Sequence, residues 1–152
     1  MRKSGVENKI RQINEMKLHL PSLSVNEGMA RAAVAAFCAQ LDPSSSDLAD
    51  VKCAVSEAVT NCIVHGYRDS VGDIYINVRL YSDGGVRIVI KDKGCGIEDV
   101  DLARQPLYTT DAEGERSGMG FTVMESFCDK VRVVSKCKKG TTVTLYKKMK
   151  RR

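Results

Sequence analysis

Glu57 and Asn61 are the first two side chains whose types and spacing could do chemistry in this chain of 152 residues. The apolar residues between 51 and 63 recur at helical spacing and leave Glu57 and Asn61 together on the opposite side. Such a pair can hold a hydrated Mg²⁺ together with phosphate groups, because this ion prefers hard oxygen ligands and keeps several waters. The alternative is an ordinary solvated helix face, where polar residues four apart are common.

A glycine-rich turn supplies the second candidate set, in which Asp92 is followed by Gly94 and Gly96. Glycines allow the backbone to approach a flat ligand, and a carboxylate at the end of a strand can accept a hydrogen bond from an exocyclic amine. A strand that simply ends in an Asx-type turn would use the same residues, so this alternative stays open.

The third candidate set is Arg116 with Gly118 and Gly120, just before an expected helix. Free N–H groups and the helix dipole favour an anion there, and arginine adds a forked phosphate donor. The spacing fits neither a P-loop nor a dinucleotide-binding turn, and a flexible hinge is the alternative. Farther on, Thr141 follows Gly140 at the start of the last expected strand, where its hydroxyl could reach a ligand, although threonine is common in strands.

Two expected helices in the first half of the chain must position some of these candidate residues. One is expected from about 25 to 41, after Ser24, whose spacing to Glu27 is typical of a capping box. The other is expected from about 45 to 65, with Ser44 to Ser46 as its cap and Gly66 as a left-handed stop. The apolar stripe of the first would consist of Met29, Ala32, Ala33, Ala36 and Phe37.

Alternating apolar residues predict strands in the rest of the chain. The expected elements are a strand over 17–20, a hairpin of 74–80 with 86–90, a helix over 121–128, and a final hairpin of 131–135 with 141–146. Helices grouped early and antiparallel strands grouped late predict an α+β fold, a two-layer sandwich of helices on a mixed, mostly antiparallel sheet. We expect one domain over 15–146, an extension over 1–14 and a basic tail over 147–152.

In their order along the chain, these motifs resemble the GHKL ATP-binding superfamily over about residues 16–146. A narrower resemblance is to the anti-sigma F family of spore-forming bacteria, whose members are serine kinases of an anti-anti-sigma partner. It is carried by Ser56-Glu57-Ala58-Val59-Thr60-Asn61, His65-Gly66-Tyr67, residues 103–110 and Glu115-Arg116-Ser117-Gly118-Met119-Gly120-Phe121, with residues 31–35 and 39–43 of the first helix. The dimerisation helix of histidine kinases has no counterpart in these motifs.

The resemblance implies a role for each matching residue. Glu57 would be the general base, Asn61 the Mg²⁺ ligand, and Asp92 the group that reads the adenine amine of ATP. Gly94 and Gly96 would let the base approach, and Thr141 would add a polar contact. The residues that hold the phosphates in the closing lid would be Thr110, Arg116, Ser117, Gly118, Met119 and Gly120. The resemblance also implies that Arg31 contacts the protein partners, a sigma F-type factor and the anti-anti-sigma factor, and that the chain forms a homodimer.

Composition excludes several other classes. The net charge of +5 is concentrated in residues 1–17 and 147–152, tryptophan is absent and aromatic residues make up 5%, so we expect no direct nucleic-acid partner. No apolar run reaches the ~20 residues of a membrane helix, so we expect a cytoplasmic protein. The six cysteines lack metal-ligand spacing and are expected to be reduced.

Two further functions remain open at this stage. One is a nucleotide-dependent module that sequesters a sigma factor with little kinase activity. The other is a detached catalytic domain of the histidine-kinase type, which would serve a phosphoacceptor histidine on another protein.

Overall fold

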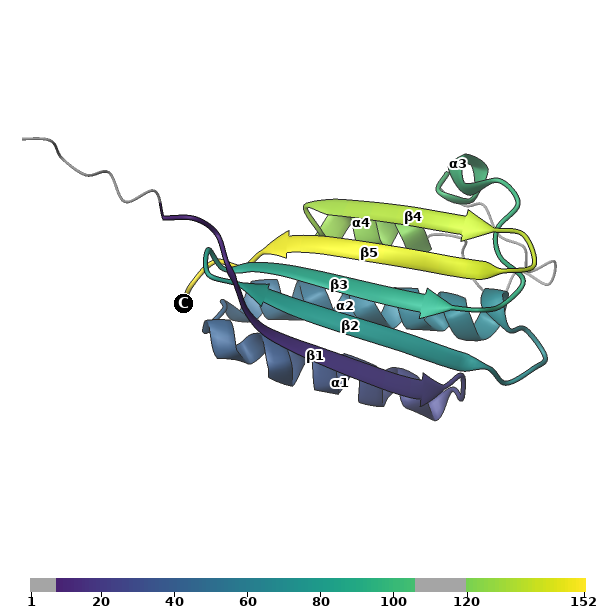
Figure 1. The fold of residues 1–152 in the computed structure, drawn as a ribbon, viewed down its shortest axis with the longest axis horizontal. Helices are drawn as coiled ribbons and strands as arrows, with labels where there is room; N and C mark the ends of the chain where they lie inside the picture. The colour runs from purple at the N-terminus through teal and green to yellow at the C-terminus, as the bar shows by residue number, and fades with distance from the viewer. Residues whose placement is uncertain (1–7, 106–119) are drawn as a thin grey trace, which may run out of the picture.

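A five-stranded sheet carries helices on one of its faces in the computed structural model, which describes residues 8–105 and 120–152 (Figure 1). The strands are β1 (Gln12–Pro21), β2 (Asp73–Tyr81), β3 (Gly85–Asp92), β4 (Lys130–Lys136) and β5 (Gly140–Lys148). They pair in the order β1-β2-β3-β5-β4, and every pairing is antiparallel. The expected α+β sandwich is therefore confirmed, with no parallel pair among the described strands.

The helices are α1 (Val25–Cys38), α2 (Ser45–Asn61), the short α3 (Val100–Ala103) and α4 (Gly120–Phe127). A 3-10 turn over Ala39–Leu41 follows α1, and a π-helical turn over Cys62–Gly66 follows α2. Helices α1, α2 and α4 lie behind the sheet in Figure 1. None of the described helices is long and apolar enough to cross a membrane.

The core lies between this helical layer and the sheet, because alternate strand residues point toward the helices. On β2 these are Ile74, Ile76, Val78 and Leu80, which meet Val86, Ile88 and Ile90 of β3 and the expected apolar side of α2. Each large aliphatic side chain buried in this way contributes ~1.5–3 kcal/mol relative to its exposed state.

The expected apolar stripe of α1 is mostly wrong: of its residues, Phe37 packs partly buried against the core, but Met29, Ala32 and Ala36 are exposed. The side chains that α1 buries are those of Ala30, Val34, Ala35 and Cys38, whereas Val25 is 80% and Met29 is 55% exposed. The helix is rich in alanine on all sides, so its sequence did not distinguish the two faces. It therefore presents an apolar strip to solvent.

Both expected domain boundaries also need correction. β1 begins at Gln12, inside the segment expected to be an extension. At the other end, β5 continues to Lys148, the Met149 side chain is buried, and Arg151 forms a bridge with Pro43. The Nζ of Lys147 bonds to the carbonyl of Phe127 and lies 3.4 Å from Asp50, so the basic end is part of the folded domain.

The helix signals were partly correct. Ser44 caps α2, because its hydroxyl accepts the Asp47 N–H at 3.1 Å. Ser24 makes no such side-chain bond, so the expected capping box is absent. Gly66 is also not a left-handed stop, since the positive φ in this region belongs to Arg68. All six cysteines are free thiols, as expected, and burial raises the pKa of Cys38 to about 12.

Candidate functional site

Asp92 is a buried carboxylate at the end of β3, with only 4% of its surface exposed. Burial raises its pKa, while hydrogen bonds from the backbone N–H of Gly94, the thiol of Cys62 and the backbone N–H of Thr141 act in the opposite direction. The Gly94 bond measures 2.9 Å. A buried carboxylate lowers the stability of the fold unless its charge is paired or its oxygens accept hydrogen bonds.

Gly66 faces this carboxylate from the π-helical turn after α2. A Cβ at Gly66 would lie 3.1 Å from the carboxyl atoms of Asp92, so a side chain there would crowd the group. The sequence pattern suggested a helix stop at Gly66 and missed this role. No local pattern separates this role from a helix stop, because the contact is with Asp92, which is distant in the sequence.

The glycines of the Asp92 turn allow the chain to pack closely on itself. A Cβ at Gly94 would come within 2.2 Å of the Gly66 carbonyl oxygen, and one at Gly96 within 2.2 Å of the Lys136 carbonyl oxygen. Gly140 has φ +112°, and a Cβ at this position would come equally close to the backbone of Asp92. Close contacts with the backbone of the chain therefore account for these glycines. That the glycines also let a ligand base approach stays a prediction.

Thr141 reaches the Asp92 carboxylate through its backbone N–H, and its hydroxyl has another partner. The Thr141 Oγ1 lies 2.8 Å from the Oγ of Ser135, which also accepts the N–H of Ile97 at 2.7 Å. Ser135 therefore ties β4, β5 and the glycine turn together. The sequence analysis did not single out Ser135, because a lone serine in a strand carries no distinguishing pattern.

Tyr67 fastens the other side of the glycine turn. Its hydroxyl donates to the carbonyl of Asp73 and accepts the N–H of Lys93 at 2.8 Å. The ring lies where a Cβ of Gly72 would be, 2.1 Å from its nearest ring atom, so this contact requires glycine at 72. The turn that presents Asp92 is thus held from both β2 and β4.

Glu57 and Asn61 lie together on α2, as their spacing predicted. Both side chains are next to the start of α4. A Cβ built on Gly120 would come within 3.1 Å of the Asn61 side chain and 3.4 Å of Glu57 Oε2. Asn61 directly precedes the π-helical turn that holds Cys62 and Gly66 beside Asp92. One continuous region therefore contains a buried carboxylate, a half-buried carboxylate and an amide.

The side chains of Glu57 and Asn61 supply hard oxygen donors that suit Mg²⁺. Within residues 8–105 and 120–152, no cluster of three or more His, Cys, Asp or Glu could hold a metal. An ion beside Glu57 and Asn61 would therefore take most of its ligands from phosphates and water, as Mg²⁺ commonly does.

Arg31 projects from α1 toward α2. Its Nη1 lies 3.1 Å from Glu27 Oε1 and 3.3 Å from the Oγ of Ser56, the residue before Glu57. The side chain is 44% exposed. Five other expected phosphate or lid residues, Thr110, Arg116, Ser117, Gly118 and Met119, lie outside the described residues.

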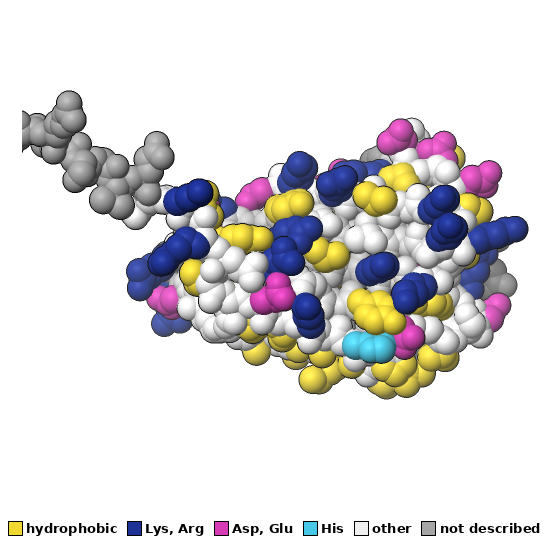
Figure 2. All heavy atoms as spheres, in the orientation of Figure 1, with side chains coloured by type: hydrophobic (Ala, Val, Ile, Leu, Met, Phe, Trp, Pro, Cys, Tyr) yellow, Lys and Arg dark blue, Asp and Glu magenta, His cyan; other side chains and the backbone are white. Residues whose placement is uncertain are grey.

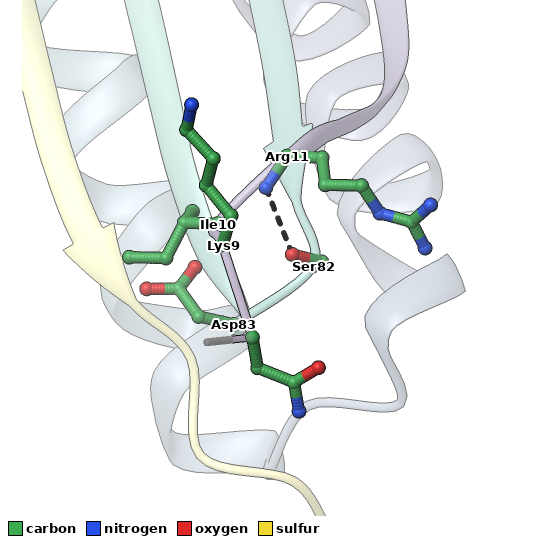
Figure 3. A pocket seen from close by; sticks show the side chains of 6 residues that line it. Lys9, Ile10, Arg11, Ser82 and Asp83 are labelled. Carbon is green, nitrogen blue, oxygen red and sulfur yellow. Dashed lines mark hydrogen bonds between the residues drawn. The ribbon is translucent and has the colours of Figure 1, made fainter. Parts of the chain in front are cut away.

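A separate hollow lies at the opposite end of β3 (Figure 3). It is lined by residues 8–11 together with Ser82 and Asp83. The backbone N–H of Arg11 donates to the Ser82 hydroxyl at 3.0 Å, which fastens the start of the chain to the β2–β3 turn. The hollow contains none of the expected site residues.

Helices on one face of an antiparallel sheet, with a buried carboxylate at the end of a central strand, are the architecture of the histidine kinase-like ATPase class. The family model described as "Histidine kinase-like ATPase domain" matches residues 20–147. An "Anti-sigma F factor" of Priestia megaterium is 53% identical over 135 residues, which cover 88% of this chain and 92% of the relative. One from Shouchella clausii is 51% identical over 90% of this chain and 93% of its own length. The chain belongs to the anti-sigma F factor family of histidine kinase-like ATPases.

Solved structures agree with this placement. The RsbU and RsbW domains of a Mycobacterium tuberculosis protein match with a TM-score of 0.68 and 25% identity, over 92% of this chain and 34% of that longer chain. A blue-light activated histidine kinase of Erythrobacter litoralis matches with a TM-score of 0.54 over 78% of this chain and 40% of its own. At 17% identity, the second likeness concerns the fold alone.

Proposed function

We propose that this chain is an anti-sigma factor that binds and inhibits a sporulation sigma factor of the sigma F type. It would use Mg-ATP to phosphorylate a serine on an anti-anti-sigma partner, in the cytoplasm. The observation that carries the proposal is the meeting of Glu57, Asn61 and Gly120 at the start of α4, where Asn61 directly precedes the π-helical turn that contacts Asp92. Membership of the family supplies the partner classes.

Asp92 would bind the adenine end of ATP. Its carboxylate is already held by N–H groups of Gly94 and Thr141, and an exocyclic amine can donate to its remaining acceptor capacity. Because Gly66 has no side chain, this residue leaves space next to the carboxylate. Because the group is buried, a hydrogen bond to it is stronger than one formed in water.

Glu57 would act as general base on the partner's serine. As the serine oxygen bonds to the γ-phosphorus and the bond to the ADP oxygen breaks, the hydroxyl proton passes to the Glu57 carboxylate. Asn61 would hold Mg²⁺, which neutralises phosphate charge when bound. Gly120, with Arg116 and Gly118 before it in the sequence, would bind phosphate through backbone N–H groups and the guanidinium.

Arg31 would bring the protein partner to this base. Its contact with Ser56 places the guanidinium one residue from Glu57 along α2. A partner carboxylate that meets the forked guanidinium would therefore hold the partner's serine near the catalytic region. The same arginine would contact the sigma factor, so the two partners would compete for it.

The homodimer would form through an exposed apolar strip at the start of α1 and just before it, which we define as Leu23, Val25 and Met29. These side chains are 45%, 80% and 55% exposed, which is unusual for neighbouring large apolar residues. Val25 and Met29 are four residues apart and share one side of the helix. A second copy of the strip would remove them from water.

The direct test is incubation of the full chain with Mg-ATP and the candidate anti-anti-sigma protein, followed by mapping of the modified residue. The proposal predicts one acid-stable phosphoserine and no product without Mg²⁺. An acid-labile phosphohistidine would instead indicate a detached histidine-kinase domain. Tight nucleotide-dependent sigma binding without phosphorylation would indicate a sequestering module.

A further inference from the structure

The face of the sheet turned away from the helices is lined by basic side chains (Figure 2). Residues along a strand alternate between the two faces of the sheet. The residues that stand between the buried core residues of each strand therefore point outward on this face. We call this surface the basic sheet face. Its lysines and arginines are Lys17, Arg79, Arg87, Lys91, Lys93, Lys130, Arg132, Lys136 and Lys148, and its carboxylates are Glu15 and Asp73.

The two carboxylates of the basic sheet face are already paired. Glu15 lies 2.7 Å from Arg79, and this hydrogen bond lowers the pKa of Glu15. Asp73 lies 2.8 Å from the ring of His19. Among the described residues, no ion pair compensates Arg87, Lys130 or Arg132. The excess positive charge is therefore available to a partner.

Arg87, Lys130 and Arg132 form a compact group on this face. The strand register places Tyr146 between Arg87 and Lys130, and Arg132 is two residues from Lys130 along β4. Side chains on one face of a strand recur about every 6.8 Å, which is the spacing of alternate carboxylates on an extended acidic segment. A second copy of this face would be repelled, so the homodimer is not its use.

The aromatic rings of the face favour carboxylates over nucleic-acid bases. The Tyr75 ring stacks on His19 with centroids 4.5 Å apart, and Lys93 Nζ lies over the same ring at 5.2 Å. Lys130 Nζ lies over Tyr146 at 5.7 Å. Single-stranded nucleic acids bind strongly by stacking bases on open aromatic rings, and these rings are already in contact with other side chains.

We propose that the basic sheet face is a docking surface for an acidic protein segment, separate from the ATP site and from Arg31. The active-site residues described above lie in the helical layer and at the strand ends, whereas this surface is the opposite side of the sheet. Charge complementarity would steer the segment to the face and make its affinity strongly dependent on salt.

The test uses the full chain and fluorescently labelled oligoglutamate, with oligothymidylate of equal chain charge as the competing probe at physiological ionic strength. The triple variant Arg87→Glu, Lys130→Glu and Arg132→Glu should bind oligoglutamate about tenfold or more weakly. The matched control is Lys52→Glu, Lys150→Glu and Arg152→Glu, which changes net charge equally at exposed positions elsewhere. It should retain most of the affinity.

Unchanged affinity of the triple variant, or an equal loss in the control, would overturn the proposal, as would failure of oligoglutamate to bind the wild type. Tighter binding of oligothymidylate than of oligoglutamate would overturn it in favour of nucleic acid. Thermal unfolding of both variants keeps the comparison valid. A triple variant that unfolds is replaced by Arg132→Glu alone, which is exposed and should lose about threefold.

Discussion

Asp92 is a buried carboxylate whose ionisation bears on both the stability of the fold and the proposed binding of ATP. Its pKa is raised mainly by burial, so the ionised form is less favourable in the folded chain than in the unfolded chain. A raised carboxyl pKa stabilises the fold below the unfolded pKa of 3.8, and this contribution is lost as the pH rises through the folded value. At neutral pH the ionised Asp92 is therefore a cost to the fold.

The variant Asp92→Asn should weaken ATP binding by roughly ten- to a hundredfold, since a hydrogen bond to a charged group contributes ~1.5–3 kcal/mol. The free energy of unfolding at neutral pH should stay equal or rise, because the desolvated charge is gone. Calorimetric titration and denaturant unfolding measure the two effects. Unchanged ATP affinity in the folded variant would show that Asp92 does not read adenine.

The variant Arg31→Glu separates partner binding from chemistry at the residue scale. It should weaken binding to the sigma factor and to the anti-anti-sigma protein by about 2–5 kcal/mol, because it removes a forked donor and adds repulsion. The fold loses the pair with Glu27, about 0.3–0.5 kcal/mol, and the hydrogen bond to the Ser56 hydroxyl. Calorimetry against each partner, with ATP affinity as a control, measures this. Glu27→Gln is the matched variant and should retain both partners.

At the scale of elements, the glycine turn after β3 depends on the π-helical turn after α2. The N–H of Cys95 donates to the Gly66 carbonyl at 2.9 Å, and a Cβ at Gly94 would overlap the same peptide. These two segments are about thirty residues apart in sequence, and their contact creates the Asp92 site. A small change at either segment should therefore be felt at the site.

The variant Gly94→Ala should lower the free energy of unfolding by ~1–3 kcal/mol, because its Cβ would overlap the Gly66 carbonyl oxygen. It should also weaken ATP binding by displacing Asp92. The matched control is Gly28→Ala in α1, where the nearest side-chain atom is 3.8 Å away. That change should raise stability by ~0.8–1 kcal/mol through helix propensity. Equal effects of the two substitutions on denaturant unfolding would contradict this account of the turn.

The sequence predicted those elements whose signals are local. The serine cap before α2, the alternation of β2 and β3, and the shared side of Glu57 and Asn61 all follow from spacing within a few residues. The buried face of α1 did not follow, because alanines occupy both faces and tertiary packing decides between them. The roles of Gly66 and Ser135 depend on contacts between distant segments, which no local pattern encodes.

At the scale of the whole molecule, the chain has three surfaces of different character. The helical layer and strand ends contain the expected ATP site, α1 exposes an apolar strip, and the basic sheet face covers the other side (Figures 1 and 2). These surfaces lie on different parts of the molecule, so each can be altered with little effect on the others.

Met29→Glu tests the assembly of the molecule. It should convert the proposed homodimer to a monomer, because a charge placed within the apolar strip would be buried without a partner. Sedimentation at concentrations where the wild type is dimeric measures the change. Val134→Glu is the matched control, since Val134 is similarly exposed at 54% but lies on β4. A dimer that persists in Met29→Glu would place the interface elsewhere.

The central claim is that Glu57 takes the serine proton in an ATP-dependent phosphoryl transfer. The most direct measurement is the single-turnover rate of phosphorylation of the anti-anti-sigma protein by wild type and Glu57→Gln, with saturating Mg-ATP. We predict a loss of about 10²–10⁴-fold with ATP and partner affinity retained, because glutamine keeps the shape of glutamate and removes its basicity. A variant that phosphorylates its partner at a rate near that of the wild type would contradict the account.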